Sequence, residues 1–295
     1  MVISNILGGL GNQMFQYAAG RALAVAQGLP LYLDLSDFQG YHLHNGFELS
    51  RVFNGLFELA EEHQLQQVIG WQACRPVRRI LKHRQFALFR DKRFIVEPHF
   101  HYWPDFFAIR HSCYLVGYWQ SENYFKSIEK IIRQDFRFKE RLYGRNAELA
   151  KLIDENNSVS LHIRRGDYVH NAATNATHGL VSLAYYKGAI ARIAKEVGAP
   201  FFVIFSDDID WARQNLEISW PCCFVGDNQG VDSYLDMQLM SLCRHHIIAN
   251  SSFSWWGAWL GSWPEKQVFY PAHWFAKGNF DTVTLCPPDW IRLDC

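Results

Sequence analysis

The segment HIRRGDYV, residues 162–169, places a histidine, two arginines and a carboxylate within eight positions, directly after the apolar run SVSLHI. Arg164 and Arg165 carry forked guanidinium groups, which suit phosphate oxygens. Asp167 follows them closely and could orient either arginine. The alternative is a surface salt-bridge cluster of the three charged residues. A buried strand that ends in this much charge favours a loop that meets an anion.

Two further polar segments follow predicted strands. FSDD, residues 205–208, offers the carboxylates of Asp207 and Asp208 as acceptors for a base or a ribose. NSSFS, residues 250–254, precedes a helix. Ser251 and Ser252 could therefore hold a phosphate at the positive end of that helix, or only cap it.

The acidic segment also contains the pattern DxD at Asp208 and Asp210, which many nucleotide-sugar transferases use for divalent metals. We favour Asp210 as the cap of the following helix, WARQNL, because aspartate is a common N-cap residue. The sequence therefore predicts no metal site. His162 lies within a predicted strand, where a buried, hydrogen-bonded structural histidine is the usual interpretation.

A glycine-rich turn, GGLGN at residues 8–12, connects an apolar strand (2–7) to a helix with one apolar face. Asn12 is predicted to be the N-cap of that helix. The turn lacks the third glycine of GxGxxG, and the chain contains no GxxxxGK[ST], so dinucleotide and P-loop sites are excluded. The turn is either simply tight or a second phosphate-binding turn.

The elements that must position these residues form an α/β fold. Strand, turn, helix and a second strand (29–35) open a first sheet, and a further strand is expected at 114–120. From residue 158, helical patterns separate apolar runs at 158–163, 200–206, 221–226, 245–250 and 266–271. This alternation is typical of parallel sheets covered on both faces, in which ligands bind beyond the carboxyl ends of the strands. We expect two domains, residues 1–155 and 156–295.

Composition narrows the class of protein. The formal net charge is zero, which argues against a nucleic-acid partner. Seven cysteines without CxxC or Cys/His spacing indicate a reducing compartment and no structural zinc. Without a signal peptide or an apolar run of about 20 residues, a cytoplasmic location is expected. The RGD tripeptide at 165–167 would need an exposed hairpin and a secreted chain to act in adhesion, so that interpretation is set aside.

The basic stretch RPVRRILKHR, residues 75–84, has two interpretations. A solvated helix face is the more usual one, and contact with an anionic membrane is the alternative.

Four segments, GGLGNQMFQYA, HIRRGDY, FSDD and NSSFSWWGAW, resemble in order those of the α-1,2-fucosyltransferases of bacteria and animals. GYWQSENYF and YLDMQLMSL extend the similarity over nearly the whole chain. The resemblance implies a GT-B fold, with two Rossmann-like domains facing across a cleft. It implies inverting transfer of fucose from GDP-fucose to the 2-hydroxyl of a terminal galactose on a β-galactoside glycan, without metal or any cofactor. The bacterial branch builds surface glycans from the cytoplasmic side. Peripheral contact with the membrane that carries a lipid-linked glycan, at the inner face of the plasma membrane, is therefore one expectation.

The resemblance also implies roles for individual residues, with the C-terminal domain holding GDP-fucose and the N-terminal domain mainly the acceptor. Arg164 is expected at the β-phosphate with Arg165 beside it, His162 and Asp208 at guanine, Ser251 and Ser252 at phosphates, Asn12 at the pyrophosphate from the other domain, and Gln120 and Glu122 in the acceptor cleft.

The catalytic base must come within hydrogen-bond reach of the acceptor hydroxyl. Asp167 is the leading candidate, although neighbouring arginines would lower its pKa and weaken it as a base. His178, later in the same loop, titrates nearer neutrality and is the alternative. Glu48 and Glu122 are further candidates. A metal-dependent DxD transferase and a non-catalytic protein that binds glycan or nucleotide remain the competing functions.

Overall fold

The structure, a computed structural model, describes residues 1–40, 44–166, 179–276 and 280–294. The chain divides into two compact units: Met1–Lys139 with Asp281–Leu285, and Glu140–Phe280 with Cys286–Cys295. The division therefore lies at Lys139, not near residue 155 as the polar stretch predicted. Helix α6 (Gly144–Glu155) is the reason, because its apolar residues pack onto the second sheet.

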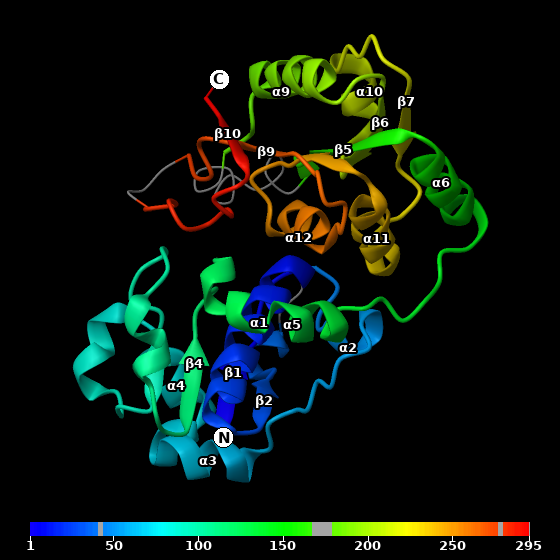
Figure 1. Cartoon of the computed structure of the whole chain (residues 1–295). Coiled ribbons are helices and arrows are strands. Elements are labelled where there is room, and N and C mark those ends of the chain that lie inside the picture. Colours follow the sequence, from blue (N-terminus) through cyan, green and yellow to red (C-terminus); the bar gives the residue numbers. More distant parts are fainter. Residues whose placement is uncertain (41–43, 167–178, 277–279, 295) are drawn as a thin grey trace. The chain divides into compact units, whose positions relative to one another are not determined.

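The first unit is built on a four-stranded parallel sheet of order β2-β1-β4-β3 (Figure 1). Its strands are β1 (Val2–Asn5), β2 (Leu31–Asp34), β3 (Phe94–Val96) and β4 (Cys113–Val116). The sequence did not predict β3. It is only three residues long and lies at the edge of the sheet.

Helices cover both faces of this sheet, as the pattern predicted. On one face, α1 (Leu10–Gln27) comes so close that a Cβ at Gly20 would lie 3.1 Å from the Ser4 side chain. On the other face, Ile3 packs with the apolar side of α3 (Glu62–Ile69). Alternate residues of β1 thus face opposite helix layers. The remaining helices are α2 (Leu49–Val52), α4 (Arg75–Leu81) and α5 (Glu129–Asp135).

The start of α1 corrects one prediction. The helix begins at Leu10 with Gly9 as its N-cap, so Asn12 lies in the first turn and does not cap it. The Asn12 side chain instead takes part in a long-range contact described below.

The second unit is built on a six-stranded parallel sheet of order β10-β9-β8-β5-β6-β7. Five of its strands match the predicted runs: β5 (Asn157–Ile163), β6 (Pro200–Ser206), β7 (Cys222–Val225), β8 (His245–Ile247) and β9 (Val268–Pro271). The sequence did not predict β10 (Ile291–Leu293), another three-residue edge strand.

Two helix layers enclose the second sheet (Figure 1). Helices α9 (Leu183–Glu196) and α10 (Ile209–Asn215) contribute to a core that includes Phe202 and Ile204. Helices α6 and α11 (Tyr234–Leu242) contribute to the core on the opposite face, around Val203 and Phe205. Helix α12 (Ser252–Leu260) follows β8. Both units therefore have the doubly covered parallel sheet that the sequence predicted. Within the described ranges, no helix is both long and apolar enough to cross a bilayer.

Candidate functional site

The polar segments of the second unit meet at the carboxyl edge of its sheet. The chain runs outward from β5 to β6 and β7 on one side, and the later strands β8, β9 and β10 lie on the other. The strand order thus reverses between β5 and β8, which is where α/β sheets of this kind bind ligands. Arg164 follows β5, and Ser251 follows the segment after β8.

Two aspartates hold the arginine loop. Strands β5 and β6 pair so that Ile163 lies opposite Ser206, which brings the next residues of both strands together. Arg164 Nε lies 3.1 Å from Asp207 Oδ2, and the backbone N–H of Arg165 donates to Asp207 Oδ1 over 2.8 Å. The guanidinium of Arg165 stacks on the Trp211 ring at 3.7 Å. Both arginines are therefore fixed by neighbouring elements, and both are largely shielded from solvent.

Asp208, not Asp210, is the N-cap of α10. Its side chain accepts from the backbone N–H of Trp211 over 3.2 Å, and Asp210 lies in the first turn. The cap prediction was wrong because the helix begins two residues earlier than the sequence indicated. The other oxygen of Asp208 lies 3.6 Å from Arg165 Nε. Asp208 thus also orients an arginine, and its contact with guanine stays a prediction.

His162 is buried on β5, at 5% exposure, with its ring 5.9 Å from that of Phe253. Burial, followed by the charge of Arg164, lowers its pKa to about 3, so the imidazole is neutral at physiological pH. Within the described part of the chain, its Nδ1 has no hydrogen-bond partner. The interpretation as a hydrogen-bonded structural histidine therefore fails at this nitrogen. An unpaired buried ring nitrogen is costly unless a ligand completes it.

The serines begin α12. Ser251 is its N-cap and accepts from the backbone N–H of Phe253 over 3.3 Å, while Ser252 is the first helical residue. Asn250 holds the preceding loop by donating to the carbonyls of Gly179 and Trp274, each over 3.2 Å. The backbone N–H groups of the first helical turn are thus presented at the same sheet edge as the arginines.

The first unit has a corresponding edge. Its strand order reverses between β1 and β4, and these strands lead into the glycine turn at Gly8 and the segment GYWQS, residues 117–121. Gln120 Nε2 donates to Asn12 Oδ1 over 2.8 Å, across 108 sequence positions. Gln16 links the same two segments, since its amide binds the Leu7 N–H and the Gly117 carbonyl. Two of the predicted residues, Asn12 and Gln120, are thus brought together.

Glu97 is a candidate that the sequence did not indicate. It follows β3, and its two carboxylate oxygens accept the backbone N–H groups of Tyr118 over 2.7 Å and Trp119 over 3.0 Å. Burial raises its pKa to about 7, although both hydrogen bonds act in the opposite direction. The side chain is only half-buried and its carboxylate has further lone pairs, so it can still meet a ligand.

The backbone around Glu97 is shaped to receive it. A Cβ at Gly117 would come within 2.5 Å of Glu97, so no larger residue fits there without rearrangement. Trp119 has a φ of 55°, a left-handed conformation that is unfavourable for tryptophan. Strained backbone conformations of this kind are frequent at functional positions. Tyr118 exposes part of its ring beside the carboxylate, a surface that suits the face of a sugar.

Of the other predicted bases, two are paired with cations and two lie outside the described residues. Glu48 is buried and pairs with Arg51 at 2.8 Å, and Glu122 pairs with Lys126 at 3.0 Å. Both carboxylates are thus engaged by a cation, although burial outweighs Arg51 and raises the pKa of Glu48 above its ordinary value. Asp167 and His178 lie outside the described residues, and their assigned roles stay predictions. In the ranges that the structure describes, no group of three or more His, Cys, Asp or Glu side chains could hold a metal ion.

Two Rossmann-like units, each with a polar carboxyl edge, define the GT-B class of nucleotide-sugar glycosyltransferases. Solved fucosyltransferases have this fold. NodZ from Bradyrhizobium matches with a TM-score of 0.52 at 15% identity, covering 87% of this chain and 91% of its own. A structure titled POFUT1 in complex with GDP-fucose matches with a TM-score of 0.50 at 13% identity, covering 91% and 97%. The predicted fold class is confirmed.

The sequence comparisons identify the family. Residues 76–271 match the model of glycosyl transferase family 11, and the chain belongs to that family. An α-1,2-colitosyltransferase of Escherichia coli is 36% identical over 100% of this chain and 99% of its own. The O-antigen biosynthesis glycosyltransferase WbnK of Escherichia coli is 34% identical over 98% and 99%. A galactoside α-(1,2)-fucosyltransferase 1 of Aotus azarae is 29% identical over 61% of this chain and 52% of its own. The resemblance drawn from the four segments is thereby confirmed at the level of the family.

Proposed function

We propose that this glycosyltransferase moves fucose from GDP-fucose to the 2-hydroxyl of a terminal galactose, with inversion and without a metal ion. The observation that carries the proposal is the braced pair Arg164 and Arg165 at the point where the strand order of the second sheet reverses. Membership of a family with named galactoside α-(1,2)-fucosyltransferases supports the acceptor.

The arginines suit a departing nucleoside diphosphate. When the bond between the anomeric carbon and the phosphate oxygen breaks, GDP gains a negative charge and the sugar acquires oxocarbenium character. Cations that are already fixed stabilise this state more than the ground state. Asp207 and Asp208 hold the two guanidinium groups, and the buried Arg165 Nε has no hydrogen-bond partner among the described residues. A bound phosphate would complete this donor.

The same edge offers groups for the rest of the nucleotide. The unpaired Nδ1 of His162 fits a hydrogen bond from or to a nucleobase, since a neutral imidazole nitrogen either donates or accepts. The first turn of α12, after Ser251, offers backbone N–H groups to a phosphate. On this assignment two arginines supply the positive charge that a divalent metal supplies in DxD transferases.

We assign the catalytic base to Glu97 in place of Asp167 or His178. The carboxylate takes the proton of the galactose 2-hydroxyl while that oxygen bonds to the anomeric carbon. The bond to the β-phosphate breaks at the same time, and GDP leaves with the electron pair. A base with a pKa near the working pH is effective because it is ionised yet still basic. Glu97 meets this condition at the carboxyl edge of the first sheet, where it accepts the backbone N–H groups of Tyr118 and Trp119.

One second donor is favoured by a specific observation. The colitosyltransferase relative matches over the whole chain, and colitose is L-fucose without its 3-hydroxyl. A site that hydrogen-bonds this hydroxyl would reject colitose strongly, whereas a site that only encloses it would discriminate weakly.

The deciding experiment offers GDP-fucose and GDP-colitose in parallel to the purified protein, with a panel of β-galactosides and in the presence of EDTA. Mass spectrometry gives the mass of the sugar transferred, and NMR gives the linkage and the anomeric configuration. An α-1,2-linked fucosyl product is expected. A colitosyl product alone would show that GDP-colitose, and not GDP-fucose, is the donor. Loss of turnover in EDTA with recovery in Mn²⁺ would establish the DxD function, and GDP binding without turnover of either donor would indicate a binding protein.

A further inference from the structure

Positive charge is concentrated in one short segment of the first unit. Residues 71–93, here called the basic segment, contain eight of the 29 Lys and Arg residues and one of the 29 Asp and Glu residues. The segment therefore carries a formal charge of +7, and the remainder of the chain carries −7. The zero net charge thus conceals a strong separation of charge between this segment and the rest of the chain.

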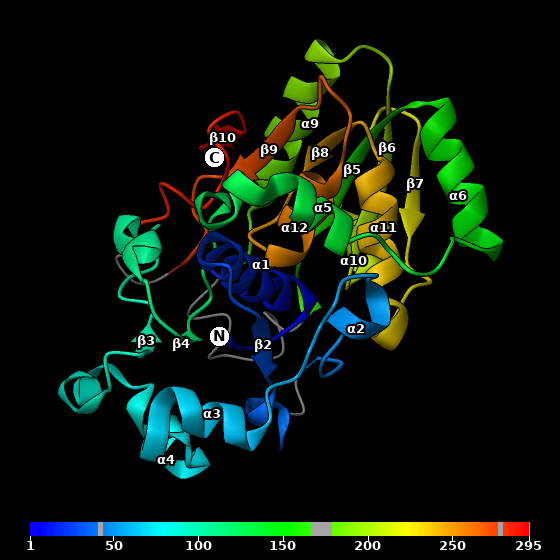
Figure 2. The same ribbon diagram turned by 60° about the horizontal axis from the view of Figure 1, so that its bottom comes forward.

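The basic segment folds as one small helical assembly at the periphery of the first unit (Figure 2). It includes α4, η3 (Arg84–Phe89) and all but the first residue of η2 (Gly70–Ala73). Gln72 ties η2 to the end of η3, since its amide binds the Phe89 carbonyl over 3.0 Å and the Asp91 N–H over 3.1 Å. Arg90 caps α4 by donating to the Leu81 carbonyl over 2.7 Å. These hydrogen bonds fix the helical elements of the assembly relative to one another.

Some of the cations face inward and have structural roles. Arg78 is buried, with its Nε 3.9 Å from Asp34 Oδ2. Lys82 Nζ donates to Asn5 Oδ1 over 3.1 Å and pairs with Asp37. These two residues attach α4 to the strand ends of the first unit and are not available to a partner.

The basic segment also exposes other cations and several large apolar side chains. Arg79, Arg84 and Lys92 are exposed, and no described carboxylate lies within 4.0 Å of their charged groups. The apolar side chains are Trp71, Ile80, Leu88 and Phe89, with Trp71 69% exposed and Leu88 96% exposed. Trp71 lies in η2, Ile80 in α4, and Leu88 and Phe89 in η3, so each of the three helical elements exposes a large apolar side chain to water.

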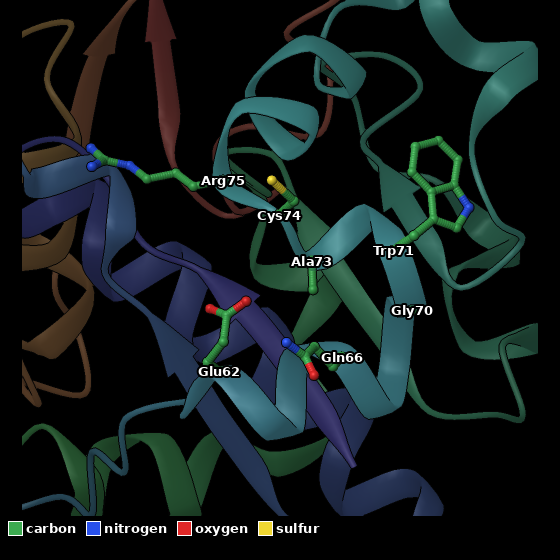
Figure 3. A pocket seen from close by; sticks show the side chains of 7 residues that line it. All are labelled: Glu62, Gln66, Gly70, Trp71, Ala73, Cys74 and Arg75. Atoms are coloured by element: carbon green, nitrogen blue, oxygen red, sulfur yellow. The ribbon is translucent and has the colours of Figure 1, made fainter.

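The surface around Trp71 shows which way the apolar groups point. A shallow hollow lies between α3 and η2, lined by Glu62, Gln66, Gly70, Trp71, Ala73, Cys74 and Arg75. In Figure 3 the Trp71 indole projects away from Glu62 and Gln66, and Arg75 extends to the opposite side, where it bonds to Gln39. The hollow therefore does not enclose the indole, which is exposed and can contact a partner surface.

We propose that the basic segment docks this protein on the surface of a phospholipid bilayer that contains anionic lipids. Tryptophan, phenylalanine and leucine side chains enter the interfacial region of a bilayer, and exposed arginine and lysine bind anionic headgroups. A nucleic acid would use the cations but gain little from Ile80 and Leu88. This docking does not depend on the donor or acceptor of the reaction.

The test is co-sedimentation with vesicles of phosphatidylcholine alone and of phosphatidylcholine with about one-third phosphatidylglycerol. We expect binding to the mixed vesicles that falls with salt. Neutralising Arg79, Arg84 and Lys92 to glutamine should weaken it by about a hundredfold, from about fivefold per cation. A matched variant, with Lys151, Lys187 and Lys195 changed to glutamine, removes the same charge from exposed positions outside the basic segment and should bind like the wild type.

A second variant, Leu88→Ser with Phe89→Ser, separates insertion from charge attraction. Both side chains are exposed, so the fold should survive, which thermal unfolding verifies. Binding to mixed vesicles should fall at least tenfold, because each buried apolar side chain contributes to partitioning. Equal loss in both triple variants, unchanged binding in the serine variant, or no binding to mixed vesicles would overturn the proposal. Tight binding to an oligonucleotide with none to vesicles would assign the surface to a polyanion instead.

Discussion

If Glu97 is the base, the pH dependence of the reaction must follow its ionisation. Burial raises its pKa to about 7, and only the ionised carboxylate can accept the proton. The ionised fraction falls about tenfold for each pH unit below the pKa, so kcat/KM at pH 6 should be about one-tenth of its plateau value. Activity should therefore be lost as the pH falls through about 7 and level off above about 8. Initial rates with GDP-fucose and a soluble β-galactoside, measured in constant-ionic-strength buffers from pH 5 to 9, give this profile.

The variant Glu97→Gln removes the charge and almost preserves the shape. Loss of a general base should lower kcat by about a hundredfold to ten-thousandfold, and the acidic limb of the profile should disappear. The new amide group must place an NH₂ against the N–H of Tyr118 or Trp119, so a modest loss of stability is also expected. Binding of GDP, measured by calorimetry, should be unchanged.

Asp236 provides the matched control. Burial raises its pKa to about 7 as well, but it lies on α11 and bonds to Asn228 in the second unit. Asp236→Asn should therefore leave the acidic limb in place. The reasoning about Glu97 is refuted if Glu97→Gln keeps the wild-type acidic limb. It is also refuted if kcat stays within about threefold of wild type while the melting temperature falls, because Glu97 would then only brace the turn at residues 117–119.

Three further predictions test the rest of the site. Arg164→Lys keeps the charge but loses the guanidinium fork braced by Asp207, so kcat should fall by about a hundredfold and GDP affinity by less; near-normal kcat would return the loop to a surface salt-bridge cluster. His162→Phe keeps the buried ring and removes the unpaired nitrogen, so calorimetry should show weaker GDP binding with an undiminished melting temperature; unchanged GDP affinity would leave this histidine without a ligand. Asp236 has a folded-state pKa above its unfolded value, so its contribution to stability is lost as the pH rises from about 4 to about 7. Asp236→Asn should thus raise the melting temperature at pH 8, where the free energy of unfolding should increase by at most about 4 kcal/mol. It should leave the melting temperature unchanged at pH 4, and an equal shift at both pH values would exclude the linkage.

The parts of the fold that the sequence predicted are those with a strong local pattern. The run PFFVIFS forms β6 at the predicted residues 200–206, because a continuous apolar run between helical segments can only be buried on both faces. Strands β3 and β10 have three residues each and lie at sheet edges, where no comparable run is needed. Their pairing depends on neighbours that are distant in sequence.

The helix caps were missed for a similar reason. Asparagine and aspartate are common caps, which favoured Asn12 and Asp210. In the structure Gly9 and Asp208 take these positions, and the Asn12 amide oxygen binds Gln120 instead. A local preference cannot show that a side chain has a better partner more than a hundred residues away.

The residues of the candidate site also differ in whether a local pattern predicts them. The arginine loop and the serines could be predicted, because each follows an apolar strand directly and the carboxyl ends of parallel strands share one edge. Glu97 could not, since its strand was not predicted and its role depends on the N–H groups of Tyr118 and Trp119, over twenty positions later. A single glutamate among apolar and aromatic residues gives no signal of a raised pKa.

The two edges differ in how their charges are compensated. Arg164 and Arg165 are each braced by an aspartate, so their positive charge is fixed and costs little to maintain. Glu97 has no cationic partner among the described ion pairs, and burial therefore brings its pKa to about 7. A departing diphosphate requires a charge that does not change during the reaction, whereas an attacking hydroxyl requires a group that can gain a proton. A cation placed beside Glu97 would lower that pKa, and on the proposed mechanism it would weaken the base. On the proposed mechanism, the aspartates at the arginines and the lack of a described cation at Glu97 thus meet two different requirements of one reaction.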